Sequence, residues 1–273
     1  VALDARSGRE RWRRHFIPPA QPTGESTAGT PQYAPSGVPI WAGMAMDEKR
    51  LYIATGDDYS GSGSEHSDSI IALDKASGEI IWVRQARFGD IWNGSCENLD
   101  PVNCPDDNGP DYDYGAGPVI ALDSQGRRVI LAGDKGGVVA ALDAANGNVL
   151  WKNKVGRGGV VAGINFGLAA HDGKVFVPVS DVPDGRTYDE PARPGLYALN
   201  IDTGDYVWQA PALEDVCNGR PGCYPGYSAA ISVTDEYVLA GSNEGYLRAF
   251  DLRTGAVLWE FDTTQSFLAV DGR

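Results

Sequence analysis

One eleven-residue phrase occurs five times in this chain, and it limits the folds that the chain can adopt. Each copy begins with Ala, an apolar residue and then Asp or Asn, and it ends with a Gly four residues before a Trp. The five Trp residues are spaced 51 to 70 residues apart, at positions 12, 82, 151, 208 and 259. Self-similarity near this period is typical of propellers and other repeat arrays.

The repeat unit reads as short strands joined by tight turns. In the third copy an apolar run ends at Asp143, Gly147 occupies a turn, and a second strand leads to Trp151. A further apolar strand precedes four of the copies, at 51–54, 129–132, 175–177 and 237–240. We therefore predict an all-β fold, a β-propeller built of four-stranded antiparallel blades.

The number of repeats sets the expected extent of the ring. Residues 1–273 should form a single partial propeller domain, with about four full blades and partial blades at both ends. An open ring would leave strand edges exposed, which natural proteins avoid. We therefore expect the chain to be a piece of a longer protein.

Composition agrees with this fold and excludes some partners. Gly is abundant at 35 residues, Pro is frequent at 17 and Met is scarce at 2, which suits strands and turns. The formal charge of −14 argues against nucleic acids and anionic membranes as partners, because both would be repelled. No apolar stretch reaches the 18 residues or so of a membrane span.

The four cysteines form two short-range pairs, Cys96 with Cys104 and Cys217 with Cys223. Each pair lies in a loop rich in Gly, Pro and Asp, so we expect two disulfides and a periplasmic or secreted protein. A metal site and free thiols are the alternatives. No Cys-x-x-Cys motif and no adjacent His is present, which disfavours zinc and c-type haem.

Two long insertions, at 13–40 and 84–117, are expected to be loops. The first carries six Pro, and the second carries one cysteine pair and seven acidic residues. Binding sites are common in long loops on a rigid β scaffold, although such insertions can also be decoration without function.

Residues within the repeat are expected to be structural. The Asp can accept turn N–H bonds, and the Trp can pack between neighbouring blades. Four other segments depart from the repeat and are the candidates for chemistry. They are a segment beginning near Trp41 and expected to be a strand over 40–47, Thr-Gly-Asp-Asp-Tyr-Ser at 55–60, Gly-Pro-Asp-Tyr-Asp-Tyr-Gly at 109–115, and Gly-Asp-Lys-Gly-Gly at 133–137.

The phrase Ala-x-Asp-x-x-(Ser/Thr)-Gly-x-x-x-Trp resembles the tryptophan-docking repeat of quinoprotein alcohol dehydrogenases. The long insertions and the segments at 55–60 and 109–115 resemble the polyvinyl alcohol dehydrogenase branch most closely. The resemblance implies a ring of eight blades when complete, with pyrroloquinoline quinone (PQQ) and calcium on its axis. Non-catalytic assembly-factor propellers share the repeat phrase but not the departing segments.

Roles follow from the resemblance residue by residue. Trp41 matches the Trp that stacks on the quinone, and Asp57 matches a cation ligand, where a carboxylate is a suitable hard donor. Asp111 matches the catalytic Asp, which is also a cation ligand. Asp113 is the alternative base, since Pro110 stands where the family has Trp.

Three further residues complete the expected site. Lys135 matches the basic residue that hydrogen-bonds the quinone oxygens, and Asn165 and Tyr227 match residues that line the cofactor pocket. Each candidate also has an ordinary structural interpretation, because Trp commonly packs in cores, Asp commonly caps turns, and Lys is commonly exposed. The family's glutamate ligand is expected just upstream of Val1, and no adjacent Cys pair matches the family's vicinal disulfide.

The expected function is oxidation of an alcohol, with polyvinyl and secondary alcohols as candidates, by base-assisted hydride transfer to the cation-bound quinone. A separate acceptor such as a cytochrome c would then take the electrons. The alternative function is a non-catalytic scaffold for protein assembly, and a third is a carbohydrate-binding or sensor propeller. Convergence of Trp41, Asp57, Asp111 and Lys135 on one point would favour the enzyme.

Overall fold

Each repeat phrase forms two antiparallel strands joined by a tight turn. The computed structural model describes residues 1–97, 102–106, 108–212 and 217–268. In the third repeat the carboxylate of Asp143 accepts a hydrogen bond from the N–H of Ala145 at 2.7 Å, and Gly147 adopts a φ of +73°. The turn-capping role predicted for the repeat Asp is therefore confirmed here.

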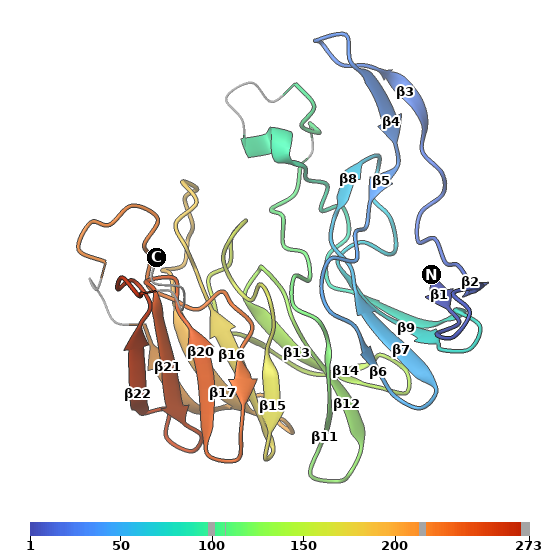
Figure 1. Cartoon of the computed structure of the whole chain (residues 1–273). Coiled ribbons are helices and arrows are strands. Elements are labelled where there is room, and N and C mark those ends of the chain that lie inside the picture. Colours follow the sequence, from blue (N-terminus) through green and yellow to red (C-terminus); the bar gives the residue numbers. More distant parts are fainter. Residues whose placement is uncertain (98–101, 107, 213–216, 269–273) are drawn as a thin grey trace.

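Four sheets of four antiparallel strands follow one another around an arc (Figure 1). The first comprises β6 (Ala45–Met46), β7 (Arg50–Ala54), β9 (Ser69–Asp74) and β10 (Ile80–Gln85). The second comprises β11 (Val119–Leu122), β12 (Arg128–Gly133), β13 (Val138–Asp143) and β14 (Val149–Lys154). The third comprises β15 (Ala169–His171), β16 (Lys174–Val179), β17 (Gly195–Asn200) and β18 (Tyr206–Pro211). The fourth comprises β19 (Ser232–Val233), β20 (Tyr237–Gly241), β21 (Tyr246–Asp251) and β22 (Val257–Asp262).

A two-stranded sheet of β1 (Ala2–Leu3) and β2 (Glu10–Trp12) precedes these four. Its Trp12 packs with Phe16 against the first four-stranded sheet. The predicted all-β fold with four-stranded antiparallel sheets is thus confirmed.

The repeat tryptophans join each sheet to the next. The indole N–H of Trp82, on the first four-stranded sheet, donates to the carbonyl oxygen of Ala144 on the second at 3.2 Å. Its ring lies over Gly147, where a Cβ atom would come within 2.6 Å of the indole. The same arrangement links Trp12 to Gly78, Trp151 to Gly204, and Trp208 to Gly255. The predicted packing of Trp between neighbouring blades is confirmed at these four positions.

The hydrophobic core lies between the sheets rather than at one centre. Between the first and second four-stranded sheets, Tyr52, Ile70 and Trp82 pack with Ile130 and Leu142. Comparable clusters fill the next two interfaces. Alternate strand residues therefore face opposite neighbours, as expected of stacked sheets.

The prediction that the insertion at 13–40 is a plain loop is wrong. It contains a hairpin of β3 (Gln21–Glu25) and β4 (Pro31–Ala34), closed by a turn in which Gly29 has a φ of +73°. The following strand, β5 (Ser36–Gly37), pairs with β8 (Asp58–Ser60). Prolines are tolerated because a two-stranded ribbon leaves half of its N–H groups outside the ladder.

The strand expected over 40–47 is also shorter than predicted, since only β6 is regular and Trp41 precedes it. The insertion at 84–117 contains the short 3₁₀ helix η1 (Gly94–Glu97). The β3–β4 hairpin and η1 stand on the same side of the sheets (Figure 1). This side therefore carries both long insertions.

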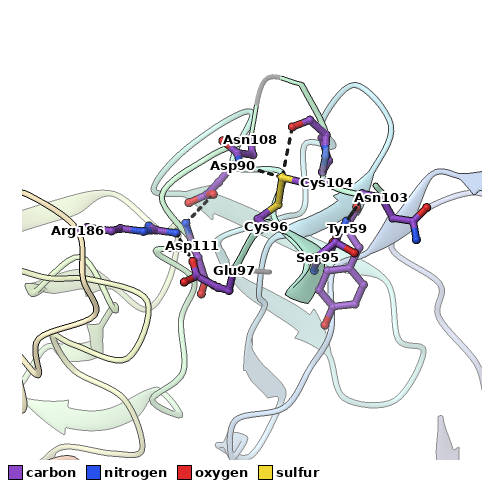
Figure 2. The surroundings of a disulfide bond; sticks show 12 residues. Tyr59, Asp90, Ser95, Cys96, Glu97, Asn103, Cys104, Asn108, Asp111 and Arg186 are labelled. Carbon is purple, nitrogen blue, oxygen red and sulfur yellow. Dashed lines mark hydrogen bonds and ion pairs between the residues drawn. A yellow bond between two sulfur atoms is a disulfide. The ribbon is translucent and has the colours of Figure 1, made fainter. Parts of the chain in front are cut away.

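Both predicted disulfides are present, Cys96–Cys104 and Cys217–Cys223. The first ties the η1 loop together, and Figure 2 shows its surroundings. Among the described residues, no helix has the length and apolar character needed to cross a bilayer.

Candidate active site

Three aspartates and one lysine meet in a buried cluster. Asp57 lies between β7 and β8, Asp111 and Asp113 lie in the segment before β11, and Lys135 lies in the turn between β12 and β13. All four are at most 8% exposed. One carboxylate oxygen from each aspartate lies within 4.8 Å of those of the other two. Residues more than 50 positions apart thus share one small volume.

Lys135 is the cation of this cluster. Its Nζ lies 2.6 Å from Asp111 Oδ1 and 3.1 Å from Asp113 Oδ1. The backbone holds it there, because the N–H of Lys135 donates to the carbonyl oxygen of Asp113 at 3.0 Å. The turn therefore fixes the ammonium group between two carboxylates.

Trp41 borders the same cluster. Its indole N–H donates to Asp113 Oδ2 at 2.8 Å, while 42% of the residue is exposed. Two glycines leave room for the ring. A Cβ at Gly56 would meet the indole nitrogen at 3.1 Å and Asp113 Oδ2 at 2.6 Å, and one at Gly115 would meet the ring at 2.3 Å. The close approach of Trp41 and Asp113 therefore explains why Gly occupies positions 56 and 115.

Sequence reasoning missed Asp90, which positions Asp111. The fully buried Asp90 accepts hydrogen bonds from the backbone N–H groups of Asp111 at 3.0 Å and of Tyr112 at 2.9 Å. Asp111 has a φ of +63°, a conformation that non-glycine residues rarely adopt. Gly109 permits the approach, because a Cβ there would lie 2.0 Å from Asp90 Oδ1. Asp90 is one of seven acidic residues in the insertion, and no spacing distinguished it.

A residue of the third four-stranded sheet also anchors the segment that carries Asp111. Arg186, between β16 and β17, donates to the carbonyl oxygen of Pro110 at 2.9 Å and pairs with Glu97 of η1 at 2.7 Å. Figure 2 shows Asp90, Asp111 and Arg186 beside the Cys96–Cys104 disulfide. The disulfide loop and the segment with Asp111 are therefore anchored together.

Burial and mutual repulsion raise the pKa values of these carboxyls. Burial first, and then the charges of Asp113 and Asp111, raise the pKa of Asp57 to about 9. Burial raises the pKa of Asp111 to about 7, against the opposing effect of Lys135. Burial lowers the pKa of Lys135, but the charges of Asp113 and Asp111 outweigh it and raise that pKa above its usual value. Three carboxyls thus share one ammonium group.

This excess of carboxyl groups fits a bound cation. Asp57 Oδ2, Asp111 Oδ2 and Asp113 Oδ1 are buried and accept no hydrogen bond from the described residues, although Lys135 Nζ lies 3.1 Å from the last of them. Buried carboxylate oxygens without partners are costly, and hard cations such as Ca²⁺ prefer such oxygen ligands. A cation here would pair these oxygens and lower the pKa values of the aspartates.

Of the two predicted pocket residues, Asn165 lies near the cluster and Tyr227 lies in the core between two sheets. The backbone oxygen of Asn165 is close to Gly115, and its neighbour Phe166 makes an edge contact with Trp41 at 6.1 Å between ring centroids. Tyr227 instead packs in the core between the third and fourth sheets, and its hydroxyl accepts a hydrogen bond from Arg248 at 3.0 Å. Asn165 therefore lies beside the cluster. Among the described residues, Tyr227 makes no contact with the cluster.

Two family models match this chain. Residues 1–98 match the β-propeller domain of glucose, ethanol and alcohol dehydrogenases, and residues 135–272 match the outer membrane protein assembly factor BamB. The first match contains Trp41 and Asp57, and the second begins at Lys135.

Two curated relatives cover nearly the whole chain. The polyvinylalcohol dehydrogenase of Sphingopyxis sp. (strain 113P3) is 36% identical over 271 residues, which is 96% of this chain and 41% of the relative. The polyvinylalcohol dehydrogenase of Pseudomonas sp. is 35% identical over 269 residues, again 96% of this chain and 41% of the relative. The chain therefore spans less than half the length of these relatives.

A solved structure shows the same fold. The quinohemoprotein alcohol dehydrogenase of Pseudomonas putida HK5 aligns with a TM-score of 0.67 at 17% identity, covering 99% of this chain and 50% of that one. The sheets described above therefore follow the arrangement of a known propeller.

Proposed function

Because this chain belongs to the β-propeller family of PQQ-dependent dehydrogenases, we propose that it carries the active site of a PQQ-dependent alcohol dehydrogenase. The observation that carries the proposal is the convergence of Asp57, Asp111, Asp113 and Lys135 beside the half-exposed Trp41. A structural scaffold gains nothing from such a cluster, because buried charges without full pairing destabilise the fold.

The side chains divide into those that would hold the cation and those that would hold the cofactor. Asp57 and Asp111 offer unpaired oxygens to a calcium ion, with Asp113 as a third carboxylate nearby. Trp41 offers an indole face to a planar ring, and Lys135 offers an ammonium group to its oxygens. Asn165, whose backbone oxygen lies beside Gly115, is proposed as a further pocket residue, and Tyr227 is proposed for the pocket from the resemblance alone. When bound, PQQ would accept a hydride, with the cation as Lewis acid.

Asp111 is the better placed of the two candidate bases. Both oxygens of Asp113 have close neighbours, Trp41 Nε1 at 2.8 Å and Lys135 Nζ at 3.1 Å. Asp111 Oδ2 accepts no hydrogen bond from the described residues, so one of its two lone pairs is left for a proton when the other faces the cation, and Asp90 fixes its backbone. A carboxylate held in this way can take the hydroxyl proton of an alcohol. Lys135, 2.6 Å from Asp111 Oδ1, would balance the charge that develops.

The partners and the compartment belong to the same proposal. The substrate is an alcohol, with polyvinyl and secondary alcohols as candidates, and an acceptor such as a cytochrome c would reoxidise the cofactor. Two disulfides favour an oxidising compartment, the periplasm or the exterior.

A non-catalytic assembly scaffold is the second candidate, favoured by the match of residues 135–272 to the assembly factor BamB. That match excludes Trp41, Asp57, Asp111 and Asp113, so it does not account for the cluster. A scaffold would bind neither PQQ nor calcium at this position, which makes the two functions separable by experiment.

The test is reconstitution of the protein with PQQ and CaCl₂, followed by alcohol-dependent reduction of a dye. Asp111→Asn should lower the rate about 1000-fold, as expected when a general base is lost. Asp123→Asn is the control, because Asp123 is also buried but lies at the opposite end of β12 from Lys135. PQQ quenching of Trp fluorescence gives the binding readout, and it should weaken in Asp57→Asn.

Two outcomes would change the proposal. Full activity in Asp111→Asn with an inactive Asp113→Asn would move the base to Asp113. Wild-type protein that binds no PQQ in the presence of calcium would refute the enzyme and leave the scaffold.

A further inference from the structure

The peptide group that joins Pro110 to Asp111 is held at both of its polar atoms. Its N–H, which belongs to Asp111, donates to Asp90 at 3.0 Å. Its carbonyl oxygen, which belongs to Pro110, accepts a hydrogen bond from Arg186 at 2.9 Å. Because a peptide group is planar, contacts on both sides fix the orientation of the plane from which the side chain of Asp111 departs.

Asp111 needs such support because its backbone is strained. Its φ of +63° is a left-handed conformation that costs a non-glycine residue free energy, and it persists only where surrounding contacts enforce it. From this backbone the carboxylate reaches Lys135 Nζ at 2.6 Å and lies beside Asp57. A peptide group that was free to rotate would let Asp111 relax to a negative φ, and its carboxylate would then take a different direction.

Arg186 is itself held in place before it reaches Pro110. The carboxylate of Asp184 accepts hydrogen bonds from the N–H of Arg186 at 3.1 Å and from the hydroxyl of Tyr188 at 2.5 Å. The guanidinium group of Arg157 lies over the ring of Tyr188, 4.2 Å from its centroid. The loop between β16 and β17 therefore presents Arg186 from a rigid base.

Glu97 binds the other half of the Arg186 guanidinium group. Its carboxylate lies 2.7 Å from Nη2, while Nη1 donates to Pro110. A guanidinium group directs these two bonds in fixed directions, which the single ammonium group of a lysine does not reproduce. Glu97 follows Cys96, which is bonded to Cys104 (Figure 2). One side chain of the third sheet thus connects the disulfide loop to the segment that carries the proposed base.

We propose that Arg186 is a positioning residue for the reaction, because it keeps the Pro110–Asp111 peptide group in the orientation that directs Asp111 into the cluster. The inference rests on the proposed function for the role of Asp111 as cation ligand and base. The side chains of Arg186 and Glu97 are 30% and 40% exposed, and ion pairs at such exposure contribute little to stability. Loss of Arg186 should therefore affect the site far more than the fold.

Arg186→Ala is the test, and Arg14→Ala is its matched control. Arg14 also donates to a backbone carbonyl oxygen, that of Gly78 at 2.8 Å, and it pairs with Glu79 at 3.2 Å. Its side chain is 31% exposed, but its partners lie in and beside the turn between β9 and β10 rather than at the cluster. The two variants thus lose the same kinds of contact at different places.

Two measurements without PQQ give the result. In Arg186→Ala, hydrogen exchange of residues 109–115 should be about tenfold faster, because a hydrogen bond from a charged donor is lost. The affinity for calcium, measured by calorimetry, should fall about tenfold, as expected when a group that orients a ligand is removed. Arg14→Ala should change neither value, and the unfolding temperatures of the two variants should agree within about 2 °C.

Arg186→Lys separates positioning from a general effect of charge. This variant keeps the positive charge but cannot bind Glu97 and Pro110 together in the directions of the guanidinium group. Its affinity for calcium should therefore fall nearly as far as that of Arg186→Ala. Full calcium affinity in Arg186→Lys would overturn the inference, because charge alone would then be sufficient.

The outcomes also separate this inference from the proposed function. Unchanged hydrogen exchange of residues 109–115 in Arg186→Ala would overturn the positioning role even if the reconstituted wild type oxidises alcohols. Faster exchange in Arg186→Ala but not in Arg14→Ala would support it even if no alcohol is oxidised. Wild-type protein that bound neither calcium nor PQQ would refute the proposed function, and the exchange rates would still decide whether Arg186 holds the peptide group.

Discussion

Substitution of Gly147 tests whether the tryptophan contacts between sheets stabilise the fold. Gly147 has a φ of +73°, and a Cβ there would lie 2.6 Å and 2.7 Å from two carbons of the Trp82 indole. Gly147→Ala must therefore displace the ring as well as strain the backbone. Gly126 provides a matched control, because its φ is +77° and a Cβ there would have no neighbour within 4 Å.

The two costs can be worked out separately. A left-handed Ala costs about 1–2 kcal/mol, and both variants carry this cost. Overpacking at Gly147 adds about 1–3 kcal/mol. Loss of the hydrogen bond from Trp82 to Ala144, now 3.2 Å, adds about 1 kcal/mol. The free energy of unfolding should therefore fall by about 2–4 kcal/mol more in Gly147→Ala than in Gly126→Ala.

Urea unfolding, followed by Trp fluorescence and by near-ultraviolet circular dichroism, gives the free energy of unfolding for each variant. Agreement of the two signals would show that one transition is being measured. A difference between the variants below about 1 kcal/mol would refute the idea that Trp82 holds the sheets together through Gly147.

Two further predictions concern buried carboxyls outside the proposed cation ligands. Burial, followed by the charge of Asp90, raises the pKa of Asp68 to about 9, so the folded state loses stability as the pH rises from about 4 to 9. The Asn side chain of Asp68→Asn stays neutral at every pH. The free energy of unfolding of this variant should therefore exceed that of the wild type by at least about 1 kcal/mol at pH 8 and be equal to it at pH 4, as measured by urea titration at both pH values. An equal gain at the two pH values would contradict this. Asp90→Asn keeps the shape of the side chain but removes one of the two acceptors for the N–H groups of Asp111 and Tyr112. The affinity for calcium, measured by calorimetry, should fall about tenfold, while the unfolding temperature should change little. Unchanged affinity would reduce Asp90 to a structural residue.

The repeat made the sheets predictable from sequence. A strand, a turn Gly and a Trp recur with the same spacing, so each copy supports the interpretation of the others. The packing of Trp82 on Gly147 follows from that pattern because both belong to the phrase. The β3–β4 hairpin occurs once and combines two Pro with Gly29, so local composition indicated a loop.

The site was predictable only through resemblance. Nothing in the spacing of Asp57 and Asp111 reveals that their carboxyls meet, because a long insertion lies between them. The role of Asp90 depends on the path of that same insertion, which has no repeat to guide it. The partner of Tyr227 is Arg248 on β21, a long-range contact that the sequence does not indicate.

The cluster takes its groups from segments attached to two adjacent sheets. Asp57 follows β7 of the first, and Lys135 joins two strands of the second. The distance between Asp57 and Lys135 is then set by the spacing of the two sheets, which the indole of Trp82 and the core around it maintain. A shift of about 1 Å between reacting groups can lower a rate about a hundredfold. Warming that loosens this interface would therefore stop the proposed reaction while every strand is still intact.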